Sequence, residues 1–202
     1  MKTYPTIAGP SKAPHKPCMA FYKHDGSNVR AEWTKKRGFD KFGTRKRLAD
    51  GTDGVFSEVP DIFREKYSEA VSQVLVDNFK GITKATIYGE FKGARSFSGV
   101  HHPKDVKDII LFDVAVHRKG MLDPGAFYKL FGHLHIAERL YIGNLNQELI
   151  DWVRNAPLEE LEEGVVCKGG KGHKLWMVKI KTDAYKARLQ QVYKDKWEMF
   201  WE

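Results

Sequence analysis

The stretch YKHDGSNVR, residues 22–30, places an Asp-Gly pair between two runs that have the composition of strands. These runs are CMAFYK (18–23) and NVRAEW (28–33), and Asp-Gly is a strong signal for a tight turn. In the second run Val29, Ala31 and Trp33 alternate, which predicts that they share one face of a sheet. The sequence therefore predicts two strands joined by a tight turn, with Lys23 at the end of the first.

The segments that follow alternate between the helical and the strand pattern. Apolar residues recur at helical spacing from 60 to 80, and Gly81 supplies a stop. KATIYGEF (84–91) and DIILFDVAV (108–116) are typical of strands, and the second is so continuously apolar that we expect a central strand covered on both faces. This mixed order favours an α+β fold with antiparallel sheets flanked by helices.

The last third of the chain continues in the same way. Helices are expected within 123–135 and 146–155, and strands at 138–143, 163–168 and 174–181. Residues 183–202 have helical spacing and should form a C-terminal helix that docks on the rest. We expect one domain over residues 1–202, without a separate C-terminal domain.

Composition narrows the class of protein. Lys and Arg number 34 against 26 Asp and Glu, a formal charge of +8 that favours a polyanionic partner such as a nucleotide or nucleic acid. The two cysteines, Cys18 and Cys167, are far apart in sequence and indicate neither a disulfide scaffold nor a zinc module. The apolar runs fall short of the ~20 residues that cross a bilayer, so we expect an intracellular, cytoplasmic protein without a membrane partner.

Several charged residues lie at expected strand ends, where they could meet a ligand. Lys179 and Lys181 are two apart on a strand and should point to one side, which calls for an anion between them or a solvated strand face. Glu90 and Glu163 each adjoin a glycine and could reach Mg²⁺ or a ribose hydroxyl, or could be ordinary turn residues. Phe112 could stack on a base or belong to the core.

A strongly basic segment, TKKRGFDKFGTRKR, covers residues 34–47. It holds seven cations and one acid, with Phe39 and Phe42 between them. This pattern fits a groove that follows phosphates and stacks on bases, and equally a solvated basic hairpin.

Taken together, six short motifs carry more information than any one of them. In chain order they are KHDG (23–26), GTRKR (43–47), YGEF (88–91), LFDV (111–114), EGVVCK (163–168) and VKIK (178–181). This set resembles the ordered motifs of the covalent nucleotidyltransferase superfamily, which includes ATP-dependent ligases and capping enzymes. The resemblance implies an ATP-grasp-like ligase adenylation domain with the nucleotide in a cleft between its sheets.

For the first four motifs, the resemblance implies roles in binding and activating the nucleotide. Lys23 would attack the α-phosphorus of ATP to give a lysyl-AMP, with the Asp25-Gly26 turn holding the strand end in place. Arg45 would contact the ribose or the incoming phosphate. Glu90 would lie near the ribose and the metal, and Phe112 would stack on the purine.

The last two motifs carry the charges implied for the phosphates and the metal. Glu163 would bind Mg²⁺ or Mn²⁺, and Lys168 belongs to the same motif. Lys179 and Lys181 would neutralise the phosphates and would also favour the neutral, nucleophilic form of the Lys23 amine.

The residue five after the lysine indicates the branch of the superfamily. Asn28 resembles the RNA ligases, whereas DNA ligases and capping enzymes usually have arginine there, and it would engage the activated 5′ end. Tyr22 departs from the pattern, because many RNA ligases carry a glutamate at this position that recognises adenine.

The sequence thus predicts an ATP-dependent RNA ligase that joins 5′-phosphate and 3′-hydroxyl ends, as in RNA repair. DNA or RNA–DNA hybrid substrates, a DNA nick ligase, a GTP-using capping guanylyltransferase and a noncatalytic nucleic-acid-binding module are the alternatives. The aromatic tail KWEMFWE (196–202) is a candidate contact for self-association or for a protein partner.

Overall fold

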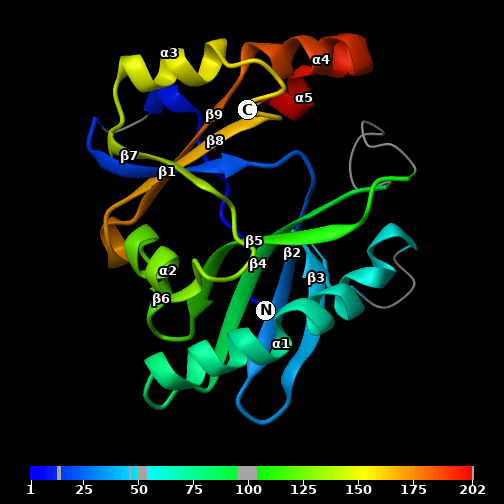
Figure 1. The fold of residues 1–202 in the computed structure, drawn as a ribbon, viewed down its shortest axis with the longest axis vertical. Coiled ribbons are helices and arrows are strands. Elements are labelled where there is room, and N and C mark those ends of the chain that lie inside the picture. Colours follow the sequence, from blue (N-terminus) through cyan, green and yellow to red (C-terminus); the bar gives the residue numbers. More distant parts are fainter. Residues whose placement is uncertain (13–14, 46, 50–53, 95–103, 202) are drawn as a thin grey trace. The chain divides into compact units, whose positions relative to one another are not determined.

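The computed structural model describes residues 1–12, 15–45, 47–49, 54–94 and 104–201, which form two compact units (Figure 1). Unit 1 comprises Met1–Pro5 and Asp25–Ile136, and unit 2 comprises Thr6–His24 and Ala137–Glu202. One boundary between the units therefore falls between His24 and Asp25, inside the stretch 22–30. The expectation of a single domain over the whole chain stays a prediction.

Unit 1 is built on a five-stranded antiparallel sheet with the strand order β3-β2-β4-β5-β6. Its strands are β2 (Ser27–Thr34), β3 (Gly38–Thr44), β4 (Lys84–Lys92), β5 (Asp108–Val116) and β6 (Gly120–Met121). Val29, Ala31 and Trp33 are all buried in β2, as their alternation predicted. The intervening Arg30 and Glu32 are buried too, so this strand is covered on both faces.

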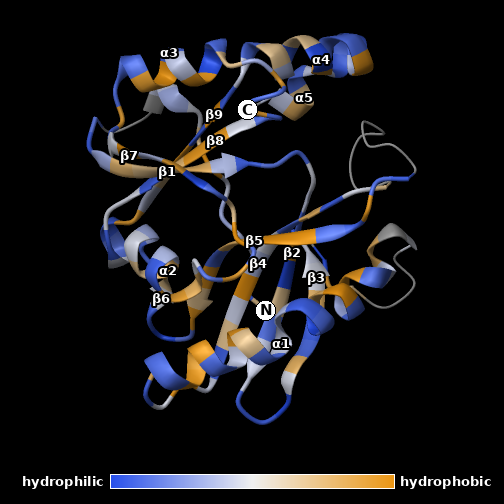
Figure 2. Cartoon of the chain, viewed as in Figure 1, coloured by the Kyte–Doolittle hydropathy of each residue, from blue (hydrophilic) through white to orange (hydrophobic). Residues whose placement is uncertain are grey.

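The β5 strand is the most apolar of this sheet, and much of it is orange in Figure 2. Ile109, Ile110 and Leu111 are buried, which confirms the expected cover on both faces. The expected central position is only partly correct, because β5 pairs with β4 along its whole length but with β6 only at Ala115 and Val116.

Helix α1 (Val59–Asn78) follows the 3-10 turn η2 (Gly54–Glu58) and packs on the sheet of unit 1. Its buried residues are Val59, Phe63, Tyr67, Val71 and Leu75. This spacing of four keeps one stripe of the helix toward the sheet. The shorter helix α2 (Pro124–Phe131) begins at Asp123, whose carboxylate accepts a hydrogen bond from the Ala126 amide.

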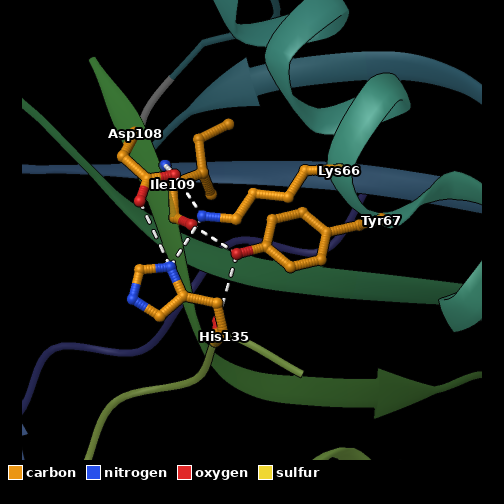
Figure 3. A network of polar contacts seen from close by, with 5 residues as sticks. All are labelled: Lys66, Tyr67, Asp108, Ile109 and His135. Carbon is orange, nitrogen blue, oxygen red and sulfur yellow. Dashed lines mark hydrogen bonds and ion pairs between the residues drawn. The ribbon is translucent and has the colours of Figure 1, made fainter. Parts of the chain in front are cut away.

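Polar contacts fix α1 against the start of β5 (Figure 3). The ammonium of Lys66 lies 2.5 Å from an Asp108 oxygen and 2.7 Å from Nδ1 of His135. The buried hydroxyl of Tyr67 lies 2.5 Å from the Ile109 carbonyl oxygen and 3.1 Å from that of His135. His135 is thus part of a structural network in this unit.

Removing the Tyr67 hydroxyl is expected to weaken unit 1 without a loss of packing. A Tyr67→Phe variant leaves the Ile109 and His135 carbonyls without this buried donor, which costs about 1–2 kcal/mol in the free energy of unfolding. Urea unfolding measures the change. Tyr141→Phe, which removes an exposed hydroxyl, is the control and should cost less; equal effects would contradict the structural role of Tyr67.

Unit 2 contains a four-stranded antiparallel sheet with the order β7-β1-β8-β9. Its strands are β1 (Pro17–Lys23), β7 (Arg139–Asn144), β8 (Gly164–Gly169) and β9 (Trp176–Lys181). The remaining elements of the unit are α3 (Gln147–Asn155), α4 (Asp183–Tyr193), α5 (Glu198–Trp201), η1 (Pro10–Lys12), η3 (Gly172–Lys174) and η4 (Lys194–Lys196). Buried apolar residues of β1, β8, β9 and α3 form its core, together with Cys18 and Cys167, which remain free thiols.

Two sequence predictions need correction. β1 and β2 do not form a hairpin: they lie in different sheets, and the Asp-Gly turn carries the chain from one unit into the other. The expected helix over residues 183–202 ends at Tyr193, because Lys194 has a positive φ of 47° and the chain continues as η4 and α5. In the helices of the described chain, none combines the length and apolar character needed to cross a bilayer.

Candidate active site

Three neighbouring strands of unit 2 bring the motif residues into a row. Lys23 ends β1, Glu163 directly precedes β8, and Lys181 ends β9. Gly164 pairs with Lys23 on one side and with Lys181 on the other. Lys23 and Lys181 are thus held on either side of Gly164, and the residue before it, Glu163, contacts Lys23, which lies 140 positions away in the sequence.

The three side chains form a largely buried ion network. Nζ of Lys23 donates a hydrogen bond to Oε2 of Glu163, and Nζ of Lys181 lies 3.0 Å from Oε1. The side chains of Glu163 and Lys181 are only 6% and 5% exposed, whereas Lys23 is 22% exposed. Glu163 is therefore the shared anion of Lys23 and Lys181, and Lys23 is the member of the network that solvent and a ligand can reach.

The charge state of Glu163 follows from these contacts. Burial alone would raise its pKa, but the ammonium groups of Lys23 and Lys181 lower the pKa below its ordinary value. The carboxylate is thus ionised at neutral pH and fixes the orientation of both lysines.

Lys181 has additional partners in the C-terminal segment. Its ammonium donates to the Phe200 carbonyl oxygen at 2.6 Å and lies over the rings of Tyr185 and Trp201, at 5.3 and 5.6 Å from their centroids. These contacts connect the end of β9 to the C-terminal segment. Lys179 alternates with the buried Val178 and Ile180, so it shares a face with Lys181 as predicted.

Gly164 is required by the close approach of β8 and β9. Its φ is +144°, and a Cβ atom would lie 2.0 Å from the Ile180 carbonyl oxygen. Only glycine lets the backbone pass between Lys23 and Lys181 at this spacing.

A Gly164→Ala variant is therefore expected to lose roughly 3 kcal/mol of unfolding free energy, since the methyl group must push β8 and β9 apart. Gly172→Ala is the matched control: its φ is also positive at +56°, but nothing lies within 4 Å of the added methyl, so only about 1 kcal/mol of backbone strain is expected. Chemical denaturation compares the two. Equal losses would show that the contact with Ile180 is unimportant.

Unit 1 carries five of the other predicted site residues, whereas Lys168 and Lys179 lie in unit 2. Asn28 and Glu90 are paired across β2 and β4. A Cβ atom on Gly26 would lie 2.9 Å from Cγ of Glu90, so the turn glycine allows β2 to begin close beside this carboxylate. Oδ1 of Asn28 is buried and has no hydrogen-bond partner in the described part of the chain, which leaves it available as an acceptor. Asp25 is buried as well.

The two remaining predicted site residues of unit 1, Phe112 and Arg45, differ in solvent exposure. Phe112 is half-buried and packs edge-on against Tyr4, with ring centroids 5.0 Å apart at 76°. Arg45 directly follows β3 and is exposed. The structure thus groups Lys23, Glu163 and Lys181 in unit 2, and Asn28 with Glu90 in unit 1.

Solved RNA ligases resemble this chain in structure. The Naegleria gruberi RNA ligase with PPi superposes with a TM-score of 0.71 over 95% of this chain and 58% of its own, at 16% identity. A mutant of that ligase with AMP and Mn gives 0.67 over 92% and 57%, also at 16% identity, and an archaeal ATP-dependent RNA ligase gives 0.71 over 96% and 52% at 15% identity. The chain has the fold of the RNA ligase nucleotidyltransferase domain.

This RNA ligase fold confirms the α+β class and the antiparallel sheets expected from the sequence. The chain spans a little over half the length of these structures. No protein-family model matches it, and no curated protein matches it in sequence.

The candidate site has a residue that could bind a divalent metal ion. In the described residues, no three His, Cys, Asp or Glu side chains converge as a metal cluster. Mg²⁺ needs fewer protein ligands, since it keeps several waters and binds through one or two carboxylates and the phosphates of a substrate. Glu163 offers an ionised oxygen ligand, although one of its two ammonium partners must turn away first.

Two features of the site were not anticipated from the sequence. The Tyr22 hydroxyl accepts a hydrogen bond from the Glu162 amide at 2.8 Å, which positions the backbone next to Glu163. Lys168 is buried, and its ammonium lies over the Phe21 ring at 5.1 Å. A hydroxyl that is 140 positions away in the sequence gives no periodic signal, so only the fold reveals the contact of Tyr22.

The two phenylalanines of the basic segment 34–47 belong to the core, and the choice between a phosphate groove and a solvated hairpin stays a prediction. Phe39 and Phe42 are buried and pack on Phe63 of α1, with ring centroids 4.8 and 5.7 Å apart. They are core residues and cannot stack on bases. Lys46 lies outside the described residues.

Proposed function

We propose that the chain is an ATP-dependent RNA ligase that works through a covalent lysyl-AMP. The observation that carries this proposal is the ion network of Lys23, Glu163 and Lys181 at adjacent strand ends. A buried carboxylate with two lysines is costly to fold, because each charge gives up its hydration. Such an arrangement is typical of a site that handles a charged substrate.

In the first step, the Lys23 ammonium gives a proton to water, and the neutral amine attacks the α-phosphorus of ATP. A P–N bond forms, the bond to the β-phosphate oxygen breaks and pyrophosphate leaves, and the amine gives a second proton to water. Glu163 orients Nζ through its hydrogen bond until the nucleotide arrives. Lys181 supplies the positive charge that stabilises the developing negative charge on the phosphates.

The remaining residues keep the roles implied by the resemblance. Glu90 would bind the ribose or the metal, Phe112 the purine, and Arg45 the ribose or phosphate. Lys168 and Lys179 would add positive charge for the phosphates. When bound, Mg²⁺ or Mn²⁺ at Glu163 or Glu90 would neutralise phosphate charge and act as a Lewis acid.

Two further steps complete ligation. AMP passes from Lys23 to a 5′-phosphate, and a 3′-hydroxyl then attacks that phosphate and releases AMP. Asn28 favours RNA as the substrate, and its buried acceptor oxygen is available to engage the activated 5′ end. The RNA ligase fold supports the same assignment.

Nucleotide labelling tests the proposal. The protein is incubated separately with α-labelled ATP and α-labelled GTP and a divalent metal, and is then given nicked RNA or nicked DNA. We expect label from ATP and sealing of the RNA nick. Label from GTP would indicate capping chemistry, preferential sealing of DNA would indicate a DNA ligase, and no label from either nucleotide would reject covalent catalysis in favour of a noncatalytic binding module.

A further inference from the structure

We infer that unit 1 carries a second RNA-binding surface, at the end of its sheet remote from Asn28 and Glu90. We call it the basic end and define it by eight cations: Lys2, Lys35, Lys36, Arg37, Lys80, Lys84, Arg118 and Lys119. The inference rests on the proposed function, because it assigns the surface to the sugar–phosphate backbone of the RNA that is joined.

Three connections of the sheet meet at the basic end. Thr34 of β2 pairs with Lys84 of β4, which brings the β2–β3 turn beside the segment that leads into β4. The Lys35 amide donates to the Thr83 carbonyl oxygen at 3.0 Å, and the His117 amide donates to the Lys84 carbonyl oxygen at 3.0 Å. Lys35 and Lys119, which are 84 positions apart in the sequence, are thus fixed on one end of one sheet.

These side chains are directed to solvent. All of the defining cations are exposed except Lys84, whose side chain is 40% exposed and half-buried as a residue. Two of the eight cations are paired with carboxylates: Arg37 lies 2.7 Å from Asp40, and Lys84 shares the buried Glu32 with Lys41 and the amino terminus. A persistent positive field of this kind attracts a polyanion.

The surface of the basic end is also hollowed. Its cationic lining residues are Lys2, Lys84 and Arg118, and the rest of the lining is Ala85, Thr86, Ala115, Val116, His117 and Gly120. Three cations around a hollow suit a phosphate group, which a flat array of lysines would not orient.

The conformation of Arg118 gives a second indication of function. It occupies the turn between β5 and β6 with a φ of +65°, and the Lys119 amide closes this turn on the Val116 carbonyl at 3.0 Å. A side chain in this region costs about 1–2 kcal/mol relative to glycine. Strained residues of this kind are concentrated at functional sites, and here the strain presents a guanidinium to the solvent.

The basic end is distinct from the predicted nucleotide site. Thr34 lies six residue steps beyond Asn28 in β2, which corresponds to about 20 Å along the strand. At a spacing of about 3.4 Å per nucleotide step, roughly six steps cover that distance. The surface would therefore contact RNA well away from the reacting ends.

Binding measurements without ATP test the inference. The variant Lys35→Gln/Lys36→Gln/Arg118→Gln is compared with the wild type and with Lys129→Gln/Lys171→Gln/Lys174→Gln, which removes the same charge from exposed positions elsewhere. RNAs of about 20 and about 5 nucleotides are titrated by fluorescence anisotropy over a range of salt concentrations, since each lost phosphate contact lowers the salt dependence.

For the long RNA, we expect the basic-end variant to raise Kd roughly tenfold and to reduce the salt slope by about two. The short RNA should lose little, and the control variant should bind both RNAs like the wild type. An equal loss in the control variant, or an unchanged Kd in the basic-end variant, would overturn the inference.

The two proposals fail in different ways. ATP labelling of Lys23 needs no RNA, so the basic-end variant should label normally and melt at the wild-type temperature if it is folded. Absence of label in the wild type would reject the ligase proposal whatever the RNA affinity. Absence of RNA binding by a wild type that labels normally would reject the basic end alone.

Discussion

A Lys23→Ala variant is expected to take up no label from α-labelled ATP while remaining folded. The amine is the only group in the ion network that can form the P–N bond and is also reachable from solvent, with 22% of its side chain exposed. Its loss leaves Glu163 paired with Lys181, so the buried carboxylate keeps one counter-charge. Gel autoradiography after denaturation measures the covalent label, and circular dichroism measures the fold.

Lys23→Arg separates the chemical role from the electrostatic one. A guanidinium can keep the ion pair with Glu163, but it stays protonated and is not a nucleophile. We therefore expect this variant to match the wild type in stability and Lys23→Ala in labelling. Label of normal intensity on either variant would show that another residue is the nucleophile.

A Glu163→Gln variant is expected to lose about 3 kcal/mol of unfolding free energy as well as its labelling activity. The amide is similar in size to the carboxylate but cannot balance Lys23 and Lys181, so a positive charge remains buried without its counter-ion. Urea unfolding gives the loss in stability.

The pH dependence of this loss has a definite sign. Because the pKa of Glu163 is lower in the folded protein than in the unfolded chain, its ionisation stabilises the fold above about pH 4.3, the ordinary value for the unfolded chain. That stability disappears as the pH falls through the lower, folded pKa. The difference between wild type and Glu163→Gln should therefore shrink in acid, and a difference independent of pH would point to packing instead.

A double-mutant cycle isolates the ion pair itself. Glu163→Gln/Lys181→Met removes both buried partners, and it should be more stable than the sum of the single changes predicts, by about 1 kcal/mol or more. Additive losses would mean that Glu163 and Lys181 do not stabilise each other.

Local patterns predicted most of the secondary structure. Apolar periodicity located α1, β4, β5, α3 and β9 closely, because each of these elements buries one stripe or both faces. The predicted β1–β2 hairpin is wrong because Asp-Gly signals a turn but does not determine which partner each strand pairs with. The predicted helix over residues 183–202 is wrong beyond Tyr193, because Lys194 has a positive φ that ends the helix. No glycine in the sequence marks this break.

The site was predicted in its residues more than in its geometry. Lys23, Glu163 and Lys181 were identified by their motifs, but the sequence could not show that one carboxylate serves both lysines. That fact depends on the register through Gly164. The contacts of Tyr22 with the Glu162 amide and of Lys181 with Phe200 join distant segments and leave no periodic trace.

The division of the chain between His24 and Asp25 also affects the order in which the two units can fold during synthesis. Residues 25–136 of unit 1 are contiguous and could acquire structure while the ribosome is still producing the rest. Strand β1 must wait for β7 and β8, which are encoded more than a hundred residues later. Lys23 thus emerges on a strand whose partners are not yet made, and its contact with Glu163 can form only after the residues of β7 and β8 have been synthesised.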